Sequence, residues 1–269
     1  MNVLDNYVMS APSDQNIVDI FKDEWTSEFP RESCLKTSPS VSRLFEDDRL
    51  FWMEEVFGGI EGFRVLDLGP LEAGHAYMME LMGAREIIGV ESNTRAFLKC
   101  LCVKEIMKLF KCQFMLGDFN SYLRNNNERF DLVVAGGVLY HQQEPNNPIE
   151  LLKLISKCTD RIYIWTHYYD SEIIGNDKIL HSYVIGKNKF FPVMTDVYDN
   201  ITYSYSIHSY RDELEKGDGF CGGSQSSSIW LTRDSILNAL NILGFKNIKI
   251  AFDEPNHVNG PALSICAMR

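Results

Sequence analysis

The sequence contains no Cys-x-x-Cys pair, although seven cysteines are spread along its 269 residues. An odd number of cysteines without such pairs predicts neither a disulfide framework nor a zinc ribbon, so we expect no metal site. Most of these thiols lie in apolar runs, where a free cysteine acts as a small core residue. Free thiols persist in a reducing compartment, and we therefore expect a cytoplasmic protein.

Positive charge is also scarce. The chain carries 26 Lys and Arg against 37 Asp and Glu, a formal net charge of −11. Proteins that grip nucleic acid irrespective of its sequence need Lys and Arg to replace the counterions of the phosphates. The acidic balance therefore argues against nucleic acid as a partner.

Long apolar stretches and a leader pattern are missing as well. No uninterrupted apolar run approaches the roughly 20 residues that a transmembrane helix needs. Residues 1–13 contain no basic region followed by an apolar run, so we expect no signal peptide. We therefore expect no association with a membrane.

Strand-like and helical patterns alternate from residue 63 onward. Short apolar runs predict strands at residues 64–68, 86–90, 113–116, 130–135, 161–165, 245–252 and 262–267. Periodic segments predict helices at residues 74–82, 94–110, 148–157 and 233–243, the last two with Asn147 and Thr232 as expected caps. Such alternation implies parallel strands joined by right-handed crossovers. The predicted fold class is α/β, a Rossmann-like doubly wound sheet of about seven strands.

The last strand should run antiparallel to the others. Only residues 253–261 separate the last two predicted strands, too few for a crossover helix. Residues 63–269 thus form one main domain.

An insertion at about residues 170–229, rich in Tyr, Ser, Gly and Asp, interrupts this domain before the last helix. A segment of this length inside a domain is usually functional or disordered, and its many aromatic residues favour order. We expect it to face a substrate.

Residues 1–62 form an N-terminal helical extension. Helical patterns cover residues 14–25 and 49–57, the second followed by two glycines. Two readings of the first pattern stay open. Its Phe21 and Trp25 either close over a ligand as a lid or pack against the sheet.

Acidic residues follow three consecutive predicted strands. Asp67 ends the first, Glu91 the second, and Asp118 follows the third, next to Phe119. Ligands of an open parallel sheet bind outside the carboxyl ends of its strands. There Gly69 admits a close approach to the backbone. Glu91 has the position from which an acid accepts both hydroxyls of a ribose, and Asp118 can accept from an adenine amino group.

Two classes of cofactor use such an edge, dinucleotides and S-adenosylmethionine. A dinucleotide site requires Gly-x-Gly-x-x-Gly, so that backbone amides approach a pyrophosphate. Here Leu71 replaces the second glycine, Pro70 lacks an amide hydrogen, and Glu72 would repel a diphosphate. A cofactor with an adenosine, a cationic sulfonium and no phosphate suits this acidic loop better. The sequence therefore favours S-adenosylmethionine over a nicotinamide dinucleotide.

From Val65 to the C-terminus, the chain resembles class I S-adenosylmethionine-dependent methyltransferases. VLDLGPLEAG is similar to their first motif, IIGVESN to their acidic second-strand motif, FDLVVAGGVLYH to their fourth-strand motif and GPALSICAMR to their last strand. The form Leu-Gly-Pro-Leu-Glu-x-Gly-His, with DIFKDEW and GFCGGSQSSSIWLT, resembles a bacterial subgroup often found beside polysaccharide genes. The family's usual Gly-x-Gly core is here Gly69-Pro70-Leu71.

The resemblance implies a set of cofactor contacts at the ends of the first four strands. These are Asp67, Gly69, Pro70, Glu72, Gly74, Glu91, Ser92, Asn93, Asp118, Phe119 and Gly136. Those of the first loop would face the methionine end, with the Gly136 carbonyl near its amino group. Those after the second strand would hold the ribose, and those after the third the adenine, with Leu116 as an alternative flank for the ring.

Methyl transfer to a hydroxyl requires alignment of the nucleophile and removal of its proton. The candidate bases are His141 after the fourth strand, His167 at the end of the fifth, and His208 in the insertion. Each could also line a pocket without moving a proton.

Three functions stay open at this point. The first is O-methylation of a small polar acceptor such as a sugar, which the tyrosines and serines of the insertion suit. The second is a tRNA methyltransferase of the wobble-base type, which the GVLYH segment also resembles. The third is a non-catalytic cofactor-binding protein. The aromatic insertion would equally suit the interface of a homodimer.

Overall fold

The main sheet has seven strands in the order β3-β2-β1-β4-β5-β10-β9. The computed structural model describes residues 6–37, 42–176, 192–209, 223, 225, 227–257 and 259–269. The strands are β1 (Arg64–Leu68), β2 (Glu86–Glu91), β3 (Cys112–Leu116), β4 (Leu132–Gly136), β5 (Arg161–His167), β9 (Asn247–Glu254) and β10 (Ala262–Met268). Pairing is parallel from β3 to β5, whereas β10 is antiparallel to both β5 and β9. The predicted α/β sheet with an antiparallel last strand is confirmed.

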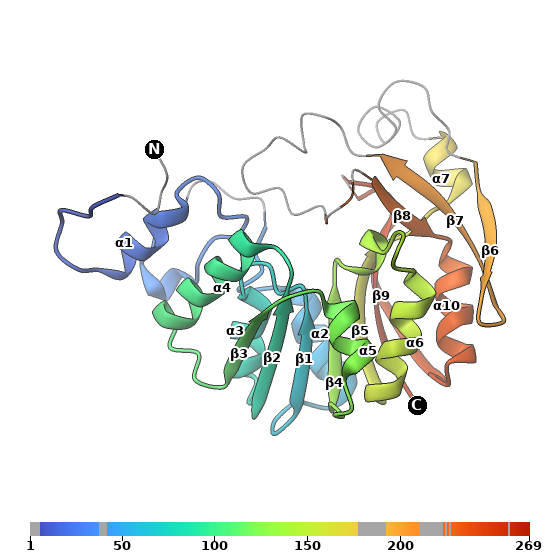
Figure 1. Cartoon of the computed structure of the whole chain (residues 1–269), viewed down its shortest axis with the longest axis horizontal. Helices are drawn as coiled ribbons and strands as arrows, with labels where there is room; N and C mark the ends of the chain where they lie inside the picture. Colours follow the sequence, from blue (N-terminus) through green and yellow to red (C-terminus); the bar gives the residue numbers. More distant parts are fainter. Residues whose placement is uncertain are drawn as a thin grey trace.

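Helices cover both faces of this sheet (Figure 1). One buried cluster joins the sheet to α5 (Phe119–Asn125), α6 (Pro148–Cys158) and α10 (Arg233–Ile242). The other joins it to α2 (Asp48–Phe57), α3 (Gly74–Leu81) and α4 (Thr94–Ile106). Helix α5 was not predicted, because Asp118 and Phe119 read as ligand contacts.

Local capping explains where the helices begin and end. The side chains of Asn147 and Thr232 accept backbone N–H groups at the starts of α6 and α10, as predicted. Pro148 occupies the first turn of α6, where its missing N–H costs nothing. Gly58 ends α2 in the left-handed conformation, which glycine adopts without strain.

The N-terminal extension is less helical than predicted. The pattern at residues 14–25 forms only α1 (Asp14–Val18) and the 3-10 turn η2 (Asp19–Phe21), and a second 3-10 turn, η3, covers Arg31–Ser33. Tertiary contacts replace the rest of the helix, since the Trp25 indole donates to the Val18 carbonyl. Phe21 and Trp25 are buried in the second cluster, so they pack as core residues. Helix α1 of the same segment contacts α4 (Figure 1).

The insertion contributes a small second sheet. Its described part contains α7 (Ser171–Asn176), β6 (Met194–Tyr198) and β7 (Ile201–Ser209), and β7 also pairs with β8 (Ser227–Leu231). All pairings in this sheet are antiparallel. It lies beside α10 (Figure 1). Strand β8 begins inside the insertion expected at about residues 170–229, and residues 177–191, 210–222, 224 and 226 of that insertion lie outside the described residues.

Candidate functional site

The predicted acids meet at one edge of the main sheet. Because β1 to β5 are parallel, Asp67, Glu91 and His167 lie at strand ends on the same side. The turn between β9 and β10 reaches this edge too, since Ala262 pairs with His167. The carboxyl edge thus gathers the candidate cofactor contacts and one of the candidate bases.

The loop between β1 and α3 turns sharply through three left-handed residues. Gly69, Leu71 and Ala73 have φ values of 67°, 55° and 60°. A Cβ at position 69 would also lie 2.8 Å from Val138. Leu71 therefore adopts a left-handed conformation although it carries a Cβ, at a cost of about 1–2 kcal/mol.

Asp67 carries a buried carboxylate oxygen that lacks a partner. Its side chain is 2% exposed, and Oδ2 accepts no hydrogen bond from any residue that the structure describes. Burial raises the pKa of Asp67 to about 6, against the influence of His75 and with that of Glu91. Buried polar atoms are almost always paired, so this one indicates a place for a ligand donor.

Glu91 is oriented by backbone amides. Its Oε2 accepts from Leu71 N at 3.1 Å and its Oε1 from Asn93 N at 2.8 Å. Burial raises the pKa of Glu91, while these hydrogen bonds oppose the shift. Each carboxylate oxygen has a second lone pair, so the group can still accept from two hydroxyls. Ser92 beside it is exposed.

Asp118 and Phe119, which the sequence predicts to contact the adenine, belong to α5 in this structure. Asp118 is its N-cap and accepts from Asn120 N and from both Ser121 N and Ser121 Oγ. Partial burial works against these hydrogen bonds, which hold the pKa of Asp118 below its usual value. Phe119 packs into the first core cluster, whereas Leu116 is 51% exposed. Of the two expected flanks, Leu116 is the accessible one.

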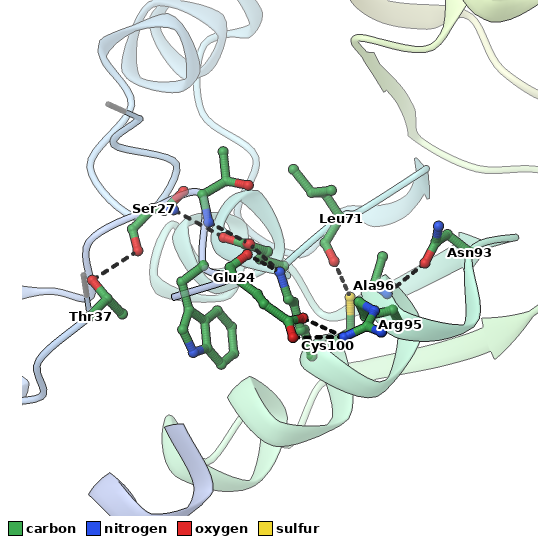
Figure 2. A network of polar contacts seen from close by, with 12 residues as sticks. Glu24, Ser27, Thr37, Leu71, Asn93, Arg95, Ala96 and Cys100 are labelled. Carbon is green, nitrogen blue, oxygen red and sulfur yellow. Dashed lines mark hydrogen bonds and ion pairs between the residues drawn. The ribbon is translucent and has the colours of Figure 1, made fainter. Parts of the chain in front are cut away.

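Glu72 faces the N-terminal extension. Its carboxylate is fully buried and accepts from Thr26 N, Ser27 N and Lys99 Nζ. Figure 2 shows this network, in which Arg95 also pairs with Glu24. Three donors from its own chain thus occupy the carboxylate that the sequence placed at the methionine end of the cofactor.

Four further predicted positions have structural roles of their own. A Cβ on Gly74 would stand 2.7 Å from the backbone of Leu44. Pro70 packs against Gly89 of β2. Asn93 caps α4 through Ala96 N. Gly136 ends β4 next to His75, whose Nδ1 would lie 3.5 Å from a Cβ there.

His75 belongs to a polar chain that sequence reasoning did not place in the site. Its Nε2 lies 2.9 Å from Oδ2 of Asp47, which also pairs with Arg49. Burial opposes the contacts with His75 and Arg49, which nevertheless hold the pKa of Asp47 far below its usual value. His75 ends the Leu-Gly-Pro-Leu-Glu-x-Gly-His form and could have been found there. Asp47 lies in the extension without any local signal.

The three candidate bases come together in one aromatic cluster. His167 and His208 both stack on the indole of Trp230, at centroid distances of 4.9 and 5.0 Å. His141 contacts Tyr140 at 4.2 Å, and Tyr140 contacts His167 at 4.9 Å.

His257, which the sequence analysis missed, completes this cluster. It lies in the turn between β9 and β10, 5.4 Å from His167. Only its isolated position in the sequence DEPNHVNG hid it, since no motif surrounds it.

Burial keeps two of these histidines neutral. It lowers the pKa of His141 to about 4 and that of His167 to about 3, the latter with help from His257. Nδ1 of His167 lies 3.0 Å from the carbonyl oxygen of Gly260. A neutral imidazole in this position donates from Nδ1 and leaves Nε2 as its acceptor.

Among the described residues, no three His, Cys, Asp or Glu side chains are placed to hold a metal ion. Within that same part of the chain, no helix combines the length and apolar character needed to cross a bilayer.

Comparison with known proteins shows the fold. No family model matches the chain. It is similar to the N-terminal domain of EvdMO1, crystallised in the presence of SAH (S-adenosylhomocysteine) and D-fucose, with 20% identity and a TM-score of 0.66 over 95% of this chain and 94% of that chain. Magnesium protoporphyrin IX methyltransferase from Synechocystis PCC 6803, with bound SAH, is 14% identical, with a TM-score of 0.53 over 82% of this chain and 81% of that chain. The chain thus has the fold of S-adenosylmethionine-dependent methyltransferases.

One curated relative matches over a shorter stretch. The tRNA U34 carboxymethyltransferase of Campylobacter hominis is 28% identical over 123 residues. The match spans 46% of this chain and 41% of that protein.

Proposed function

We propose that this chain is an S-adenosylmethionine-dependent methyltransferase that methylates a hydroxyl of a small polar acceptor such as a sugar. The buried Oδ2 of Asp67, which accepts no hydrogen bond from the residues that the structure describes, carries the proposal together with the oriented carboxylate of Glu91. The cofactor carries a positive charge and several hydrogen-bond donors. It therefore complements these two carboxylates, which carry negative charge and can only accept hydrogen bonds. The fold, shared with proteins crystallised with SAH, supports the assignment.

Different residues at the carboxyl edge of the main sheet would bind different parts of the cofactor. Asp67 would accept from its amino group, and Glu91 would accept from the ribose hydroxyls with the lone pairs that Leu71 and Asn93 leave open. Asp118 would accept from the adenine amino group, with Leu116 against the ring. When bound, the cofactor supplies an activated methyl group. The protein's part is then to align the acceptor oxygen with that methyl and to take its proton.

The aromatic cluster is the proposed acceptor side. His141 and His167 are neutral near pH 7 because burial lowers the pKa of each, so each is in the unprotonated form that a general base requires. His208 reaches the same cluster from the insertion at residues 170–229, which we propose governs acceptor binding. Stacked aromatic rings are typical walls for the apolar faces of sugars. The similar EvdMO1 domain was crystallised in the presence of D-fucose.

Calorimetric titration with S-adenosylhomocysteine tests the cofactor assignment. The parent protein should bind it and should not bind NAD. Glu91→Ala removes hydrogen bonds to a charged acceptor, worth roughly 1.5–3 kcal/mol each, and should weaken binding at least tenfold. The exposed Glu105, which pairs with Lys108 on the surface, offers a matched control as Glu105→Ala. Equal affinity in both variants would refute the placement of the ribose.

A tRNA methyltransferase is the second candidate, favoured by the 123-residue match. The net charge of −11 weighs against it, because tRNA binding draws on Lys and Arg contacts with phosphate. Methyl transfer from labelled cofactor to bulk tRNA and to a panel of free and nucleotide-linked sugars separates the two. Cofactor binding without transfer to either class would favour the non-catalytic alternative. Sedimentation of the same protein tests the proposed homodimer.

A further inference from the structure

We propose that Glu72 and Lys99 are positioning residues that fasten residues 24–27 onto the cofactor loop, so that docking of this segment and cofactor binding strengthen each other. The inference rests on the proposed function, because that function assigns the loop after β1 to the cofactor. Neither residue touches the cofactor in this proposal.

The fastening centres on a buried ion pair. Lys99 Nζ lies 3.0 Å from Oε1 of Glu72, and the two side chains are 2% and 0% exposed. Glu72 also accepts from Thr26 N at 2.7 Å and from Ser27 N at 3.1 Å. A carboxylate removed from water is tolerated only when donors of this kind surround it. The extension supplies two of the three.

Lys99 holds the same segment from α4. Its ammonium donates to the carbonyl oxygen of Glu24 and lies 5.4 Å from the centroid of the Trp25 ring. Figure 2 shows Glu24 of the N-terminal extension reaching Arg95 of α4 in the same network. Loss of either charge would leave the other buried without its partner.

The ion pair acts on the cofactor loop because Glu72 stands between Leu71 and Ala73, both in left-handed conformations. Residues with a Cβ persist in this region only where surrounding contacts hold them. Leu71 N donates to Glu91, and Leu71 O accepts from Cys100 Sγ, the neighbour of Lys99 on α4. Release of Glu72 should let the loop relax and withdraw the amide that orients Glu91.

A merely structural ion pair would affect stability alone. Coupling predicts a second effect, because docking of residues 24–27 and binding of the cofactor must then change each other's equilibrium constant by the same factor. If docking of residues 24–27 favours the cofactor, the cofactor must favour docking. This reciprocity can be measured in the unmodified protein.

The first measurement is amide hydrogen exchange with and without S-adenosylhomocysteine. The cofactor product should slow exchange at Thr26 and Ser27 by roughly fivefold or more, within the usual range of coupling energies. The amide of Ile265, a fully buried residue of β10, reports global unfolding for comparison. Unchanged exchange at Thr26 and Ser27, in a protein that binds the ligand, would overturn the proposal.

The second measurement is the affinity for S-adenosylhomocysteine in two variants. Lys99→Met keeps the length of the side chain without its charge and should weaken binding about tenfold, together with loss of the exchange effect. Arg95→Ala removes the outer pair with Glu24, in which Arg95 is 49% exposed, and should bind within about twofold of the parent. If Lys99→Met fails to fold, Glu72→Gln with Lys99→Met removes both buried charges together.

The outcomes separate this proposal from the function on which it rests. A parent protein that binds no S-adenosylhomocysteine overturns both. A parent that binds it, with Lys99→Met binding equally well or losing only stability, overturns the coupling and leaves the function intact. Weaker binding in Lys99→Met, with exchange at Thr26 and Ser27 no longer sensitive to the ligand, supports the coupling.

Discussion

The imidazole of His167 stacks on the indole of Trp230, with ring centroids 4.9 Å apart and 13° between the ring planes. His167 ends β5 of the main sheet, whereas Trp230 lies in β8 of the small sheet. His208 of β7 stacks on the same indole. The small sheet is therefore fixed to the carboxyl edge of the main sheet by aromatic packing, at the place where the acceptor is proposed to bind.

Gly260 leaves room for the Trp230 ring because it has no Cβ, and we expect Gly260→Ala to disturb the stack. A Cβ there would stand 2.2 Å from the Trp230 ring, and residue 260 has a φ of 106°. Overpacking of this kind costs about 1–3 kcal/mol in the free energy of unfolding, which urea denaturation measures. Gly117→Ala is the control, because nothing lies within 4 Å of its added Cβ. Equal stability of the two variants would contradict the observed packing.

Buried neutral histidines predict a loss of stability in mild acid. The pKa of His141 is lowered to about 4 in the folded chain, while the unfolded value is about 6.5. The unfolded state therefore binds more protons below pH 6.5, and the free energy of unfolding falls by about 1.4 kcal/mol per pH unit for such a group. His141→Gln should remove this share of the slope between pH 6.5 and pH 5. Parallel slopes for parent and variant would show that His141 is accessible to water.

Ionisation of Asp67 should lower the free energy of unfolding as the pH rises, which is opposite to the pH dependence expected from His141. Its folded pKa of about 6 lies above the unfolded value of about 3.9, so the native state loses stability as the pH rises through this range. Asp67→Asn removes the buried charge and should raise the free energy of unfolding above pH 6 by up to about 3 kcal/mol. The gain should vanish near pH 3. The same variant should bind S-adenosylhomocysteine more weakly, and tighter binding would contradict the role of Asp67.

The sequence predicts those features that depend on neighbouring residues. Asn147 before Pro148 predicts the start of α6, and the short connection before β10 predicts its antiparallel direction; both are confirmed. The alternation of strands and helices likewise predicts parallel strands, and therefore predicts that Asp67 and Glu91 lie together at the carboxyl edge of the main sheet.

Contacts between distant residues leave no local pattern. Glu72 pairs with amides 46 and 45 residues away, so its acidic character in a ligand-binding loop was read as a cofactor contact. Strand β6 is exposed along most of its length and shows no apolar alternation, which hid the second sheet. Phe119 reads as a stacking ring after Asp118, but α5 turns it into the core.

The final prediction assigns the histidines of the acceptor side. His141→Gln and His208→Gln should each leave the affinity for S-adenosylhomocysteine within about twofold of the parent, because both side chains lie in the aromatic cluster that we propose for the acceptor. General-base catalysis contributes typically 10²–10⁴-fold, so the variant that lacks the base should lose turnover by about that factor. The other should change mainly the KM for the acceptor. If both variants keep full turnover, His167 becomes the candidate, since its Nδ1 faces the Gly260 carbonyl and its Nε2 is left to accept a proton. His167→Gln with unchanged turnover would then show that the enzyme works by alignment of the acceptor alone.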